Sequence, residues 1–488
     1  MHTTITRLST SLFVLLLLMP GAAFGQTFEV SGWLPYWRSQ KSVESTLPQL
    51  QHLTEVNPFI YTVRKDGTLN VESPLTNGEW VTLRTQAKAQ GIRFIPTVMW
   101  GDGDTIHAIL SNPETRAAHV RAIAHEVFAQ NLDGIDIDYE AKRAETRPYF
   151  SLFLKELYDA IGYNKWVMCT IESRTPLDSR YASPEAIPAD IEYSNDFLEI
   201  NKYCDRVRIM AYDQGRIDLK LNDANAHPYI PVADTAWVEK VMRLALQDIA
   251  AEKLVLGIPT YGYEYDTFTD QSGDFRYSRL WSFNPGYADE VAQKLGITPT
   301  RNSAGELFLT YPASQSPDPV IPLPNATRIM SWSDDVAIQS KIALAQSLGI
   351  RGIALFKIDG GQDPDVAQIL TQTGVSGAQK VASKPVDTGL GLSTETGGGT
   401  ITRTSSAVPT KDLKYGMRTE EVRVLQKFLN AQGYTVAQSG GGSPGNETTF
   451  FGPATRAALT RFQSAHAISP AVGYYGPITR STIKTKNL

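Results

Sequence analysis

The sequence has little cysteine, and this scarcity excludes a fold that is held together by disulfides. Only Cys169 and Cys204 occur among 488 residues, whereas small exported disulfide scaffolds use cysteine densely. Cys169 lies in an apolar, strand-like run and is expected to be a small buried hydrophobe. A bridge between the two cysteines is possible but is not expected. The chain must therefore be stabilised by a hydrophobic core, and it is long enough to build a large one.

Long apolar runs are also missing, apart from one near the N-terminus. Leu12–Met19 follows the basic Arg7 and precedes Ala23-Phe24-Gly25, a small-x-small site for cleavage before Gln26. The run is short for a membrane span, although an uncleaved anchor is the alternative. No cysteine lies near the cleavage site, which excludes a lipoprotein anchor. We expect a secreted, cell-wall-associated protein with a signal peptide at residues 1–25 and no membrane attachment after cleavage.

Two kinds of binding motif are absent as well. No glycine-rich phosphate loop follows the first predicted strand, which counts against a doubly wound nucleotide-binding sheet. No basic-aromatic RNA motif occurs and the net charge is −5, so nucleic acid is not an expected partner. From Lys411 onward, however, ten Lys and Arg face four Asp and Glu. Such a basic tail is attracted to polyanions, with cell wall among them.

Apolar, β-rich runs alternate with helical stretches over most of the chain. Arg116–Gln130, Pro148–Ile161 and Ala236–Ala251 carry apolar residues at helical spacing. Eight strands that alternate with helices predict an α/β fold of the (β/α)8 TIM-barrel type over residues 26–375, with a doubly wound sheet as the runner-up. The predicted strands are Val30–Pro35, Val56–Tyr61, Arg93–Met99, Gly134–Tyr139, Trp166–Ile171, Arg206–Ala211, Leu254–Pro259 and Gly352–Phe356.

The segment between the last two predicted strands is too long for a loop. Gly262–Arg351 contains one predicted helix, Val336–Leu348, and is otherwise rich in Tyr, Phe, Pro and Gly. A small insertion on the rim of the barrel is therefore expected at about 264–327. Farther on, residues 376–410 consist mainly of Gly, Ser, Thr, Val and Pro, which indicates a flexible linker.

Residues 411–488 have the pattern of a small helical module. Thr419–Gln432 is amphipathic, and a second helix is predicted at Ala454–His466. Phe451-Gly452-Pro453-Ala454-Thr455-Arg456 recurs as Tyr475-Gly476-Pro477-Ile478-Thr479-Arg480, and each copy places Gly-Pro ahead of a helix start. We predict a three-helix module that binds the cell wall, with a purely structural domain as the alternative.

Three acidic residues alternate along the fourth predicted strand. Asp136, Asp138 and Glu140 share one face of it, and same-face residues lie roughly 6.5 Å apart along a strand. The other face carries Ile135, Ile137 and Tyr139. Carboxylates on a buried strand lose hydration and repel one another, so at least one of them holds a proton near neutral pH. A protonated carboxyl of this kind is what general acid catalysis requires.

Two other interpretations of this stretch are weaker. A calcium loop of the EF-hand type would need glycine where Ala141 stands and glutamate where Arg147 stands. A solvent-exposed strand fits poorly with the isoleucines on the opposite face. No metal and no cofactor is expected.

Aromatic and acidic residues gather where the predicted strands end, which is where (β/α)8 barrels place their chemistry. Aromatic faces cover the apolar faces of sugar rings, and carboxyls bind their hydroxyl groups, so the set indicates a glycan cleft. Trp332 lies where the insertion returns to the barrel. The strand-end residues are Tyr36, Trp37, Trp100, Glu140, Glu172, Tyr212, Asp213, Tyr261, Tyr263 and Phe356.

These motifs resemble a known family. Asp133-Gly134-x-Asp136-x-Asp138-x-Glu140 is similar to the signature of glycoside hydrolase family 18, the chitinase-like enzymes, and Met210-Ala211-Tyr212-Asp213 resembles that family's sixth-strand motif. Gly32-Trp33-Leu34-Pro35-Tyr36-Trp37 resembles the first strand of the subgroup that acts on bacterial and spore cell walls. The resemblance covers roughly Val30 to Asp359. Residues 412–483 resemble the peptidoglycan-binding family 1 module.

The chain departs from the family pattern in two places. Phe356 stands at the end of the eighth strand, where the family often has Trp. Phe94-Ile95-Pro96-Thr97 replaces a Ser-x-Gly-Gly element on the third strand. Both differences concern sugar contacts and leave the acidic residues unchanged.

The resemblance implies a mechanism in which the substrate supplies the nucleophile. Glu140 would be the acid and then the base, and Asp138 would orient the sugar's acetamide. Asp136 would share a proton with Asp138, and Tyr212 would hold the acetamide oxygen. Further substrate contacts are expected from Tyr36, Trp100, Met210, Asp213, Tyr261, Trp332 and Phe356.

The resemblance implies a glycan substrate with β-linked, N-acetylated amino sugars. The tail module on its flexible linker favours peptidoglycan, with cleavage after N-acetylglucosamine. Chitin or its oligomers is the runner-up, followed by N-glycan cores. A catalytically inactive, chitinase-like binding protein is the rival from another class. Such proteins usually lose the acid, and this chain keeps Glu140, Asp138 and Tyr212. A monomer is expected.

Overall fold

The computed structural model describes residues 28–271, 275–317, 325–360, 365–375, 408–437, 441–466, 468 and 473–486. The predicted signal peptide and nearly all of the predicted linker lie outside these ranges. Within them, no helix has the length and apolar character needed to span a membrane.

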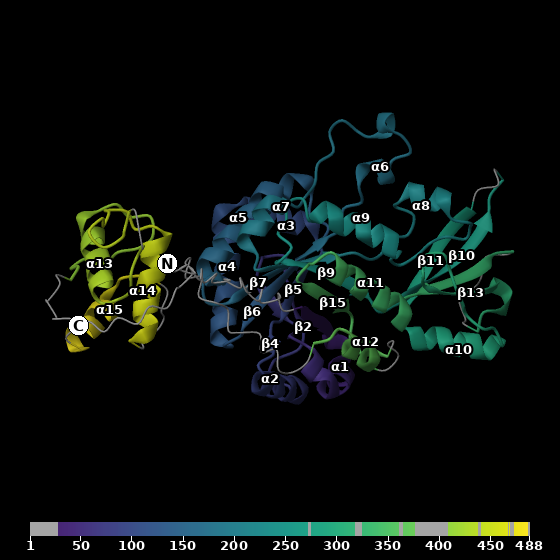
Figure 1. Ribbon diagram of the computed structural model, residues 1–488, viewed down its shortest axis with the longest axis horizontal. Helices are drawn as coiled ribbons and strands as arrows, with labels where there is room; N and C mark the ends of the chain where they lie inside the picture. The colour runs from purple at the N-terminus through teal and green to yellow at the C-terminus, as the bar shows by residue number, and fades with distance from the viewer. Residues whose placement is uncertain are drawn as a thin grey trace, which may run out of the picture.

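Eight parallel strands close into a barrel, which confirms the predicted fold class. The strands follow one another around the ring in chain order, and pairing of the first strand with both the second and the last closes it. Figure 1 shows helices outside the ring. The strands are β1 (Glu29–Pro35), β2 (Glu55–Val63), β5 (Thr97–Trp100), β6 (Gly134–Tyr139), β7 (Trp166–Glu172), β8 (Arg206–Met210), β9 (Leu254–Pro259) and β15 (Gly352–Phe356).

The helices of this part pack their apolar residues against the outward-facing side chains of the strands. Several begin at an acid or amide that caps the first turn: Asp102, Asn112 and Asp234 each accept hydrogen bonds from backbone N–H groups of the helix that follows. The helices are α1 (Ser39–Thr46), α2 (Gly78–Gln90), α3 (Gly103–Ser111), α4 (Pro113–Ala129), α5 (Arg147–Leu157), α6 (Leu177–Arg180), α7 (Phe197–Tyr203), α8 (Leu219–Ala224), α9 (Thr235–Ala245), α11 (Asp335–Ser347) and α12 (Val366–Gln372).

The third predicted strand differs from its expected form. The structure divides Arg93–Met99 into β4 (Arg93–Phe94), which pairs with β2, and β5, which starts at Thr97. Pro96 lies in the gap, and proline has no N–H to donate to a strand ladder. By contrast, β6, β9 and β15 begin and end at the predicted residues.

The insertion after β9 is a small antiparallel sheet with one helix, α10 (Pro285–Leu295). Its strand order is β11-β10-β14-β13-β12, and it has its own core around Leu309, Met330 and Trp332. It lies beyond the strand ends at one side of the barrel (Figure 1). The strands are β10 (Gly262–Thr269), β11 (Phe275–Phe283), β12 (Thr300–Arg301), β13 (Leu307–Pro312) and β14 (Thr327–Trp332).

The C-terminal module contains the three expected helices, α13 (Glu420–Ala431), α14 (Pro453–Ala465) and α15 (Pro477–Lys486). They enclose a separate core that includes Phe428 and Phe462. The sequence repeat has a structural counterpart. Gln426 donates to Thr455, and Gln463 donates to Thr479, so each glutamine binds the threonine of one copy of the repeat.

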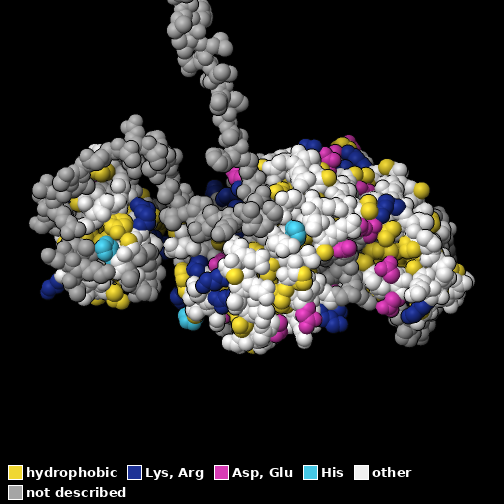
Figure 2. Space-filling model, turned by 60° about the horizontal axis from the view of Figure 1, so that its bottom comes forward, with side chains coloured by type: hydrophobic (Ala, Val, Ile, Leu, Met, Phe, Trp, Pro, Cys, Tyr) yellow, Lys and Arg dark blue, Asp and Glu magenta, His cyan; other side chains and the backbone are white. Residues whose placement is uncertain are grey.

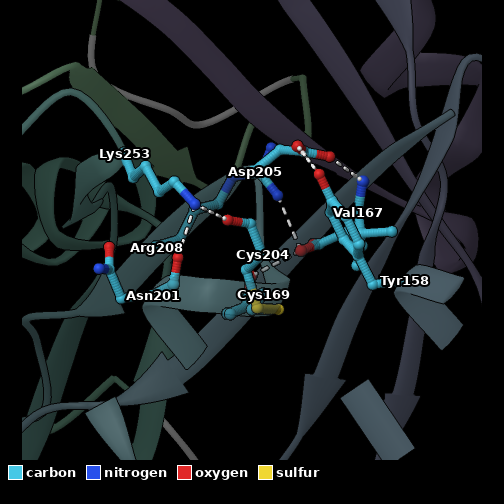
Figure 3. Close-up of a disulfide and its surroundings, with 10 residues drawn as sticks. Tyr158, Val167, Cys169, Asn201, Cys204, Asp205, Arg208 and Lys253 are labelled. Carbon is cyan, nitrogen blue, oxygen red and sulfur yellow. Dashed lines mark hydrogen bonds and ion pairs between the residues drawn. A yellow bond between two sulfur atoms is a disulfide. The ribbon is translucent and has the colours of Figure 1, made fainter. Parts of the chain in front are cut away.

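The two cysteines form a disulfide, and the expectation that they stay unpaired was wrong. Cys169 lies on β7 and points outward, and Cys204 directly follows α7, which brings their Cα atoms to 5.9 Å. Spacing in the sequence could not show this approach, because it depends on how α7 packs on the barrel. Figure 3 shows the surroundings: Asp205 accepts the backbone N–H of Val167 at 2.8 Å, and Lys253 donates to the carbonyl of Cys204 at 3.0 Å.

Removing this disulfide is expected to destabilise the protein. The bridge closes a loop with a sequence separation of 35 residues, and the Cys169→Ala/Cys204→Ala variant should lose roughly 3 to 4 kcal/mol of unfolding free energy because its unfolded chain is less constrained. Urea titrations of both proteins, with and without reductant, measure the loss. The variant should not respond to reductant, and a wild type that is equally insensitive would contradict the bridge.

Candidate active site

A cavity of about 830 Å³ opens at the carboxyl ends of the barrel strands. Residues near the ends of all eight strands, or in the loops that follow them, line this cavity, and the insertion forms one wall. The predicted residues that line it are Tyr36, Trp37, Asp138, Glu140, Glu172, Met210, Tyr212, Asp213, Tyr261, Tyr263 and Phe356. The structure thus brings together most of the set that the sequence singled out.

Strand β6 carries the acidic residues to this cavity. A side chain at Gly134 would place its Cβ 2.2 Å from the carbonyl oxygen of Trp166, so glycine allows β6 and β7 to pair closely. The strand is buried along its whole length, and Ile135 and Ile137 belong to the outer core. Asp136 and Asp138 point to the barrel interior, as the period-two pattern predicted.

Asp136 lies below the cavity and is held by four donors. It pairs with Arg208 at 2.8 Å and accepts hydrogen bonds from Trp33 at 3.1 Å and from Thr97 and Thr170 at 2.9 Å each. Its carboxyl oxygens are therefore occupied by groups other than Asp138. The counter-charge for Asp136 is the Arg208 guanidinium, and a proton shared between Asp136 and Asp138 stays a prediction.

Asp138 and Glu140 form the reactive part of the site. Burial raises the pKa of Asp138 well above its usual value, and repulsion from Glu140 and Asp136 adds to the rise. Burial also raises the pKa of Glu140, with repulsion from Glu172 as the next cause. The Oδ1 atom of Asp138 is buried and has no hydrogen-bond partner among the described residues. An unpartnered carboxyl oxygen beside a second carboxyl can receive a donor from a bound ligand.

Glu172, at the end of β7, steadies the segment that carries Glu140. Its carboxylate accepts the backbone N–H of Ala141 at 3.0 Å, pairs with Lys142 at 3.1 Å and accepts the Asn195 amide at 2.7 Å. Burial alone would raise the pKa of Glu172, but Lys142 and Asn195 hold it below its usual value. Ala141 has a φ of +55°, a strained conformation for alanine. These contacts fix the backbone directly after the acid.

Aromatic side chains form the floor of the cavity. Phe356 stacks on Tyr212 with ring centroids 5.7 Å apart and meets Trp33 and Tyr261 edge to face. Burial raises the pKa of Tyr212 well above its usual value, with Asp138 and Glu140 as further causes, so its hydroxyl keeps the proton. The ring of Phe356, for which the sequence resemblance implied a tryptophan in many relatives, is part of this floor.

Asp213 is positioned by two tyrosines rather than by a cation. It accepts hydrogen bonds from the hydroxyls of Tyr261 and Tyr263, the latter at 2.9 Å. Its φ of +58° is unusual for a residue other than glycine. A strained residue that two neighbours hold in place at a cavity is typical of a binding site.

Two predicted contact residues lie elsewhere. Trp332 is 1% exposed and packs in the core of the insertion with Phe283. Trp100 is buried against Tyr139 and His119 and borders a neighbouring groove. Both residues were predicted to contact substrate because of where they stand relative to the predicted strands. Position along the chain does not show which way an aromatic ring points.

Five charged residues of the site were missed. Arg208 and Lys142 contact the acids, and Arg38, Lys357 and Asp359 line the cavity. A signal existed for Arg208, because it shares the inward face of β8 with Met210. The described ranges contain no group of His, Cys, Asp and Glu arranged to hold a metal ion.

Comparison with known proteins places both parts of the chain in families. Residues 32–361 match the model of glycosyl hydrolases family 18, and residues 418–483 match that of a peptidoglycan binding domain. The glycosylase YvbX of Bacillus subtilis is 24% identical over 258 residues, 53% of this chain and 66% of the relative. The cortical fragment-lytic enzyme of the same organism is 24% identical over 312 residues, 63% of this chain and 65% of the relative.

Solved structures share the fold. The spore cortex-lytic enzyme SleL of Bacillus megaterium is similar with a TM-score of 0.54 at 20% identity, over 73% of this chain and 76% of that one. Chitinases are among the other matches. The chain spans less than two thirds of the length of the first curated relatives that it matches.

Proposed function

The chain belongs to family 18 of the glycosyl hydrolases, and from this membership we propose that it is an exported, retaining enzyme that cleaves the β-1,4 bond after N-acetylglucosamine in peptidoglycan. The single observation that carries the mechanism is the buried, unpartnered Oδ1 atom of Asp138 beside the raised-pKa carboxyl of Glu140. The proposal follows from what these two groups can do to a bound N-acetylated sugar.

Glu140 acts first as the acid. Burial raises its pKa, which favours the protonated form, and it gives this proton to the glycosidic oxygen as the bond to the leaving sugar breaks. The carbonyl oxygen of the substrate's own 2-acetamido group attacks the anomeric carbon from the opposite face and forms an oxazolinium cation. Glu140 then takes a proton from the water that opens this ring, so the anomeric configuration is retained.

The other acids of the cavity are poorly placed to be nucleophiles. Glu172 already accepts three donors, and Asp213 is held by two tyrosine hydroxyls. Asp359 is paired with Lys357. Burial and acidic neighbours raise the pKa of Asp138 well above its usual value, which favours the neutral form and makes it a poor nucleophile. These engagements favour an internal nucleophile from the substrate over a carboxylate of the protein.

Asp138 and Glu140 together carry the charge of the transition state. Burial raises the pKa of both carboxyls, and repulsion from Glu140 adds to the rise at Asp138, so the protonated forms of both are favoured in the free enzyme. When one proton leaves with the sugar, the pair keeps the other and carries a single negative charge next to the oxazolinium. Asp138 Oδ1 accepts the acetamide N–H, and Tyr212 donates to the acetamide oxygen. Asp136 stays paired with Arg208 beneath them.

The proposed substrate rests on the second domain. A peptidoglycan binding domain at residues 418–483 holds the enzyme close to glycan strands and raises their local concentration. Export rests on the predicted signal peptide, and the Cys169–Cys204 disulfide fits an oxidising compartment. The cortical fragment-lytic relative also supports a cell-wall substrate.

Chitin oligomers are the second candidate substrate. The aromatic floor of Phe356 and Tyr212 covers the apolar face of a sugar ring whether or not the neighbouring sugar is muramoyl. The relatives of this chain also include chitinases, such as chitinase A1 of Niallia circulans.

Digestion of purified sacculi tests the proposal. After borohydride reduction, mass spectrometry should find fragments that end in N-acetylglucosaminitol, and proton NMR should find the β-anomer first. Fragments that end in muramitol, or cleavage of chitin without any release from sacculi, would overturn the proposed substrate.

The pH dependence should respond to Glu172. The negative charge of Glu172 raises the pKa of Glu140, whereas Lys142 lowers it. Glu172→Gln removes the negative charge of Glu172 and leaves Lys142 without its carboxylate partner, so the pKa of Glu140 should fall. The alkaline limb of kcat/KM should therefore move to lower pH, because Glu140 loses its proton at a lower pH. The matched control is Glu156→Gln, whose carboxylate pairs with Arg116 on the outer helices. An alkaline limb that stays in place would contradict the coupling.

A further inference from the structure

We propose that Arg38 and Lys357 form a cationic wall that binds a carboxylate on the sugar preceding the reactive N-acetylglucosamine. The inference rests on the proposed function and deepens it, because in peptidoglycan that preceding sugar is muramoyl and carries an acidic substituent, whereas the corresponding sugar of chitin is neutral. The wall would thus select the substrate.

The two cations lie in the same cavity as the acids. Arg38 follows β1, and Lys357 directly follows β15. These two strands are neighbours in the ring, and β15 lies half a turn around it from β6, which ends at Glu140. The cations therefore face the acid across the mouth of the barrel. Among the residues that the structure describes, they are the only Lys or Arg side chains that line this cavity.

The contacts within the cationic wall do not neutralise both of its positive charges. Lys357 pairs with Asp359 and donates to Asn284 at 3.0 Å, and Asn284 donates to Asp359 at 2.8 Å. Arg38 donates to the carbonyl oxygens of Asp359 and Gly360, both at 3.2 Å, and lies 3.9 Å from the Asp359 carboxylate. Among the described residues of the wall, one carboxylate thus stands against two cations.

Donor groups also remain for a ligand. The Nη1 atom of Arg38 has no hydrogen-bond partner within the described ranges, and an ammonium such as that of Lys357 has three N–H groups, of which two are used here. Arg38 is 31% exposed at its side chain, and Lys357 is 15% exposed. Such a partly enclosed pair binds a carboxylate more strongly than surface cations do.

The direction of the glycan places the muramoyl group at this wall. In a pyranose the anomeric carbon and O4 lie at opposite ends of the ring. If the anomeric carbon of the reactive sugar is at Glu140, its O4 points across the mouth toward Arg38 and Lys357. The sugar attached through that O4 is muramoyl, and its substituent ends in carboxylate, either the free lactyl group or the peptide stem joined to it.

The surface outside the cavity offers less selectivity. The face drawn in Figure 2 carries Lys, Arg, Asp and Glu side chains in small mixed groups rather than a single field of one sign. A long-range basic surface is therefore not what would attract an anionic glycan to this face. Recognition depends instead on the two cations inside the cavity.

The test compares kcat/KM for two substrates in the full-length chain. One is a soluble muramoyl glycan and the other a neutral chito-oligosaccharide of equal length. Arg38→Gln and Lys357→Gln should each lower the muramoyl-to-neutral ratio by about ten-fold. The wild-type ratio should also fall as ionic strength rises. Lys88→Gln, an exposed lysine on α2, is the control and should leave the ratio unchanged.

Two muramoyl substrates identify the source of the carboxylate. A larger effect on amidase-treated strands assigns it to the free lactyl group, and a larger effect on stem-bearing strands assigns it to the peptide. Both outcomes support the wall. If both variants change the two kcat/KM values by the same factor, the wall is overturned even though peptidoglycan is cleaved. Failure of the wild type to cleave peptidoglycan would instead overturn the proposed function.

Lys357→Gln could unfold locally, because Asp359 is 1% exposed and would lose its ammonium partner. Arg38→Gln avoids this, since the Lys357–Asp359 pair stays intact. Thermal melting shows whether each variant is folded, and only the kcat/KM ratios of folded variants are compared. A native-like Arg38→Gln with an unchanged ratio is sufficient to reject the proposal.

Discussion

Replacement of Glu140 by glutamine should lower kcat by about 10²- to 10⁴-fold and leave glycan binding intact. Glutamine has the size of the acid and can still donate a hydrogen bond to the glycosidic oxygen, but it cannot transfer a proton. The remaining groups of the site do not replace it. Glu172 is engaged by Lys142 and Asn195, and its pKa lies below the usual value, so it is a poor acid.

The measurement is single-turnover kinetics on peptidoglycan fragments, combined with binding of the same fragments by calorimetry. Glu114→Gln is the matched control, because this glutamate is exposed in the first turn of α4 and lies outside the cavity. Its kcat should equal that of the wild type. A fully active Glu140→Gln enzyme would show that Glu140 is not the acid. A loss of both glycan binding and kcat would indicate that the substitution had disrupted the cavity.

The acidic strand could be predicted because its pattern is local. Alternation with period two fixes which side chains share a face, and the burial of Ile135 and Ile137 against the outer helices turns Asp136 and Asp138 inward. The eight-strand barrel follows from the repeated alternation of strands and helices. Neither inference required knowledge of contacts between distant segments.

The surroundings of the acids could not be predicted, because they depend on such contacts. Lys142 is only two residues after the acid Glu140 in the sequence, but its role depends on its contact with Glu172 at the end of β7. The ring of Trp332 turns into the core of the insertion, a choice made by the packing of β14. The cationic wall combines a loop after β1 with one after β15, which are more than 300 residues apart.

The structure also gives Asp136 ion-pair contacts that the sequence did not indicate. A buried series of ion pairs runs from Asp136 to Arg208, then to Glu55 and Arg93. The series continues to Glu29. Such pairs are costly to break one at a time because each partner is buried. Asp136 therefore fixes a negative charge beneath Asp138, and this charge helps to keep the proton on Asp138.

Asp138→Asn is expected to lower kcat by about 10²- to 10³-fold, with a much smaller change in the affinity for substrate. Burial and its acidic neighbours raise the pKa of Asp138 well above its usual value, which favours the protonated form in the free enzyme. Asparagine matches this neutral form in size and hydrogen bonding, so the ground state changes little. The difference arises when the oxazolinium forms, because asparagine cannot share the remaining proton with Glu140 and take up negative charge beside the cation.

This separation of kcat from binding distinguishes a charge effect from a structural one. Pre-steady-state kinetics gives the chemical step, and equilibrium binding to Glu140→Gln and Glu140→Gln/Asp138→Asn gives the ground-state affinity without turnover. Asp223→Asn, an exposed residue on α8, is the control and should behave as wild type. If Asp138→Asn lowered affinity and kcat equally, Asp138 would only position the acetamide, and the charge in the transition state would have to be held by Glu140 alone.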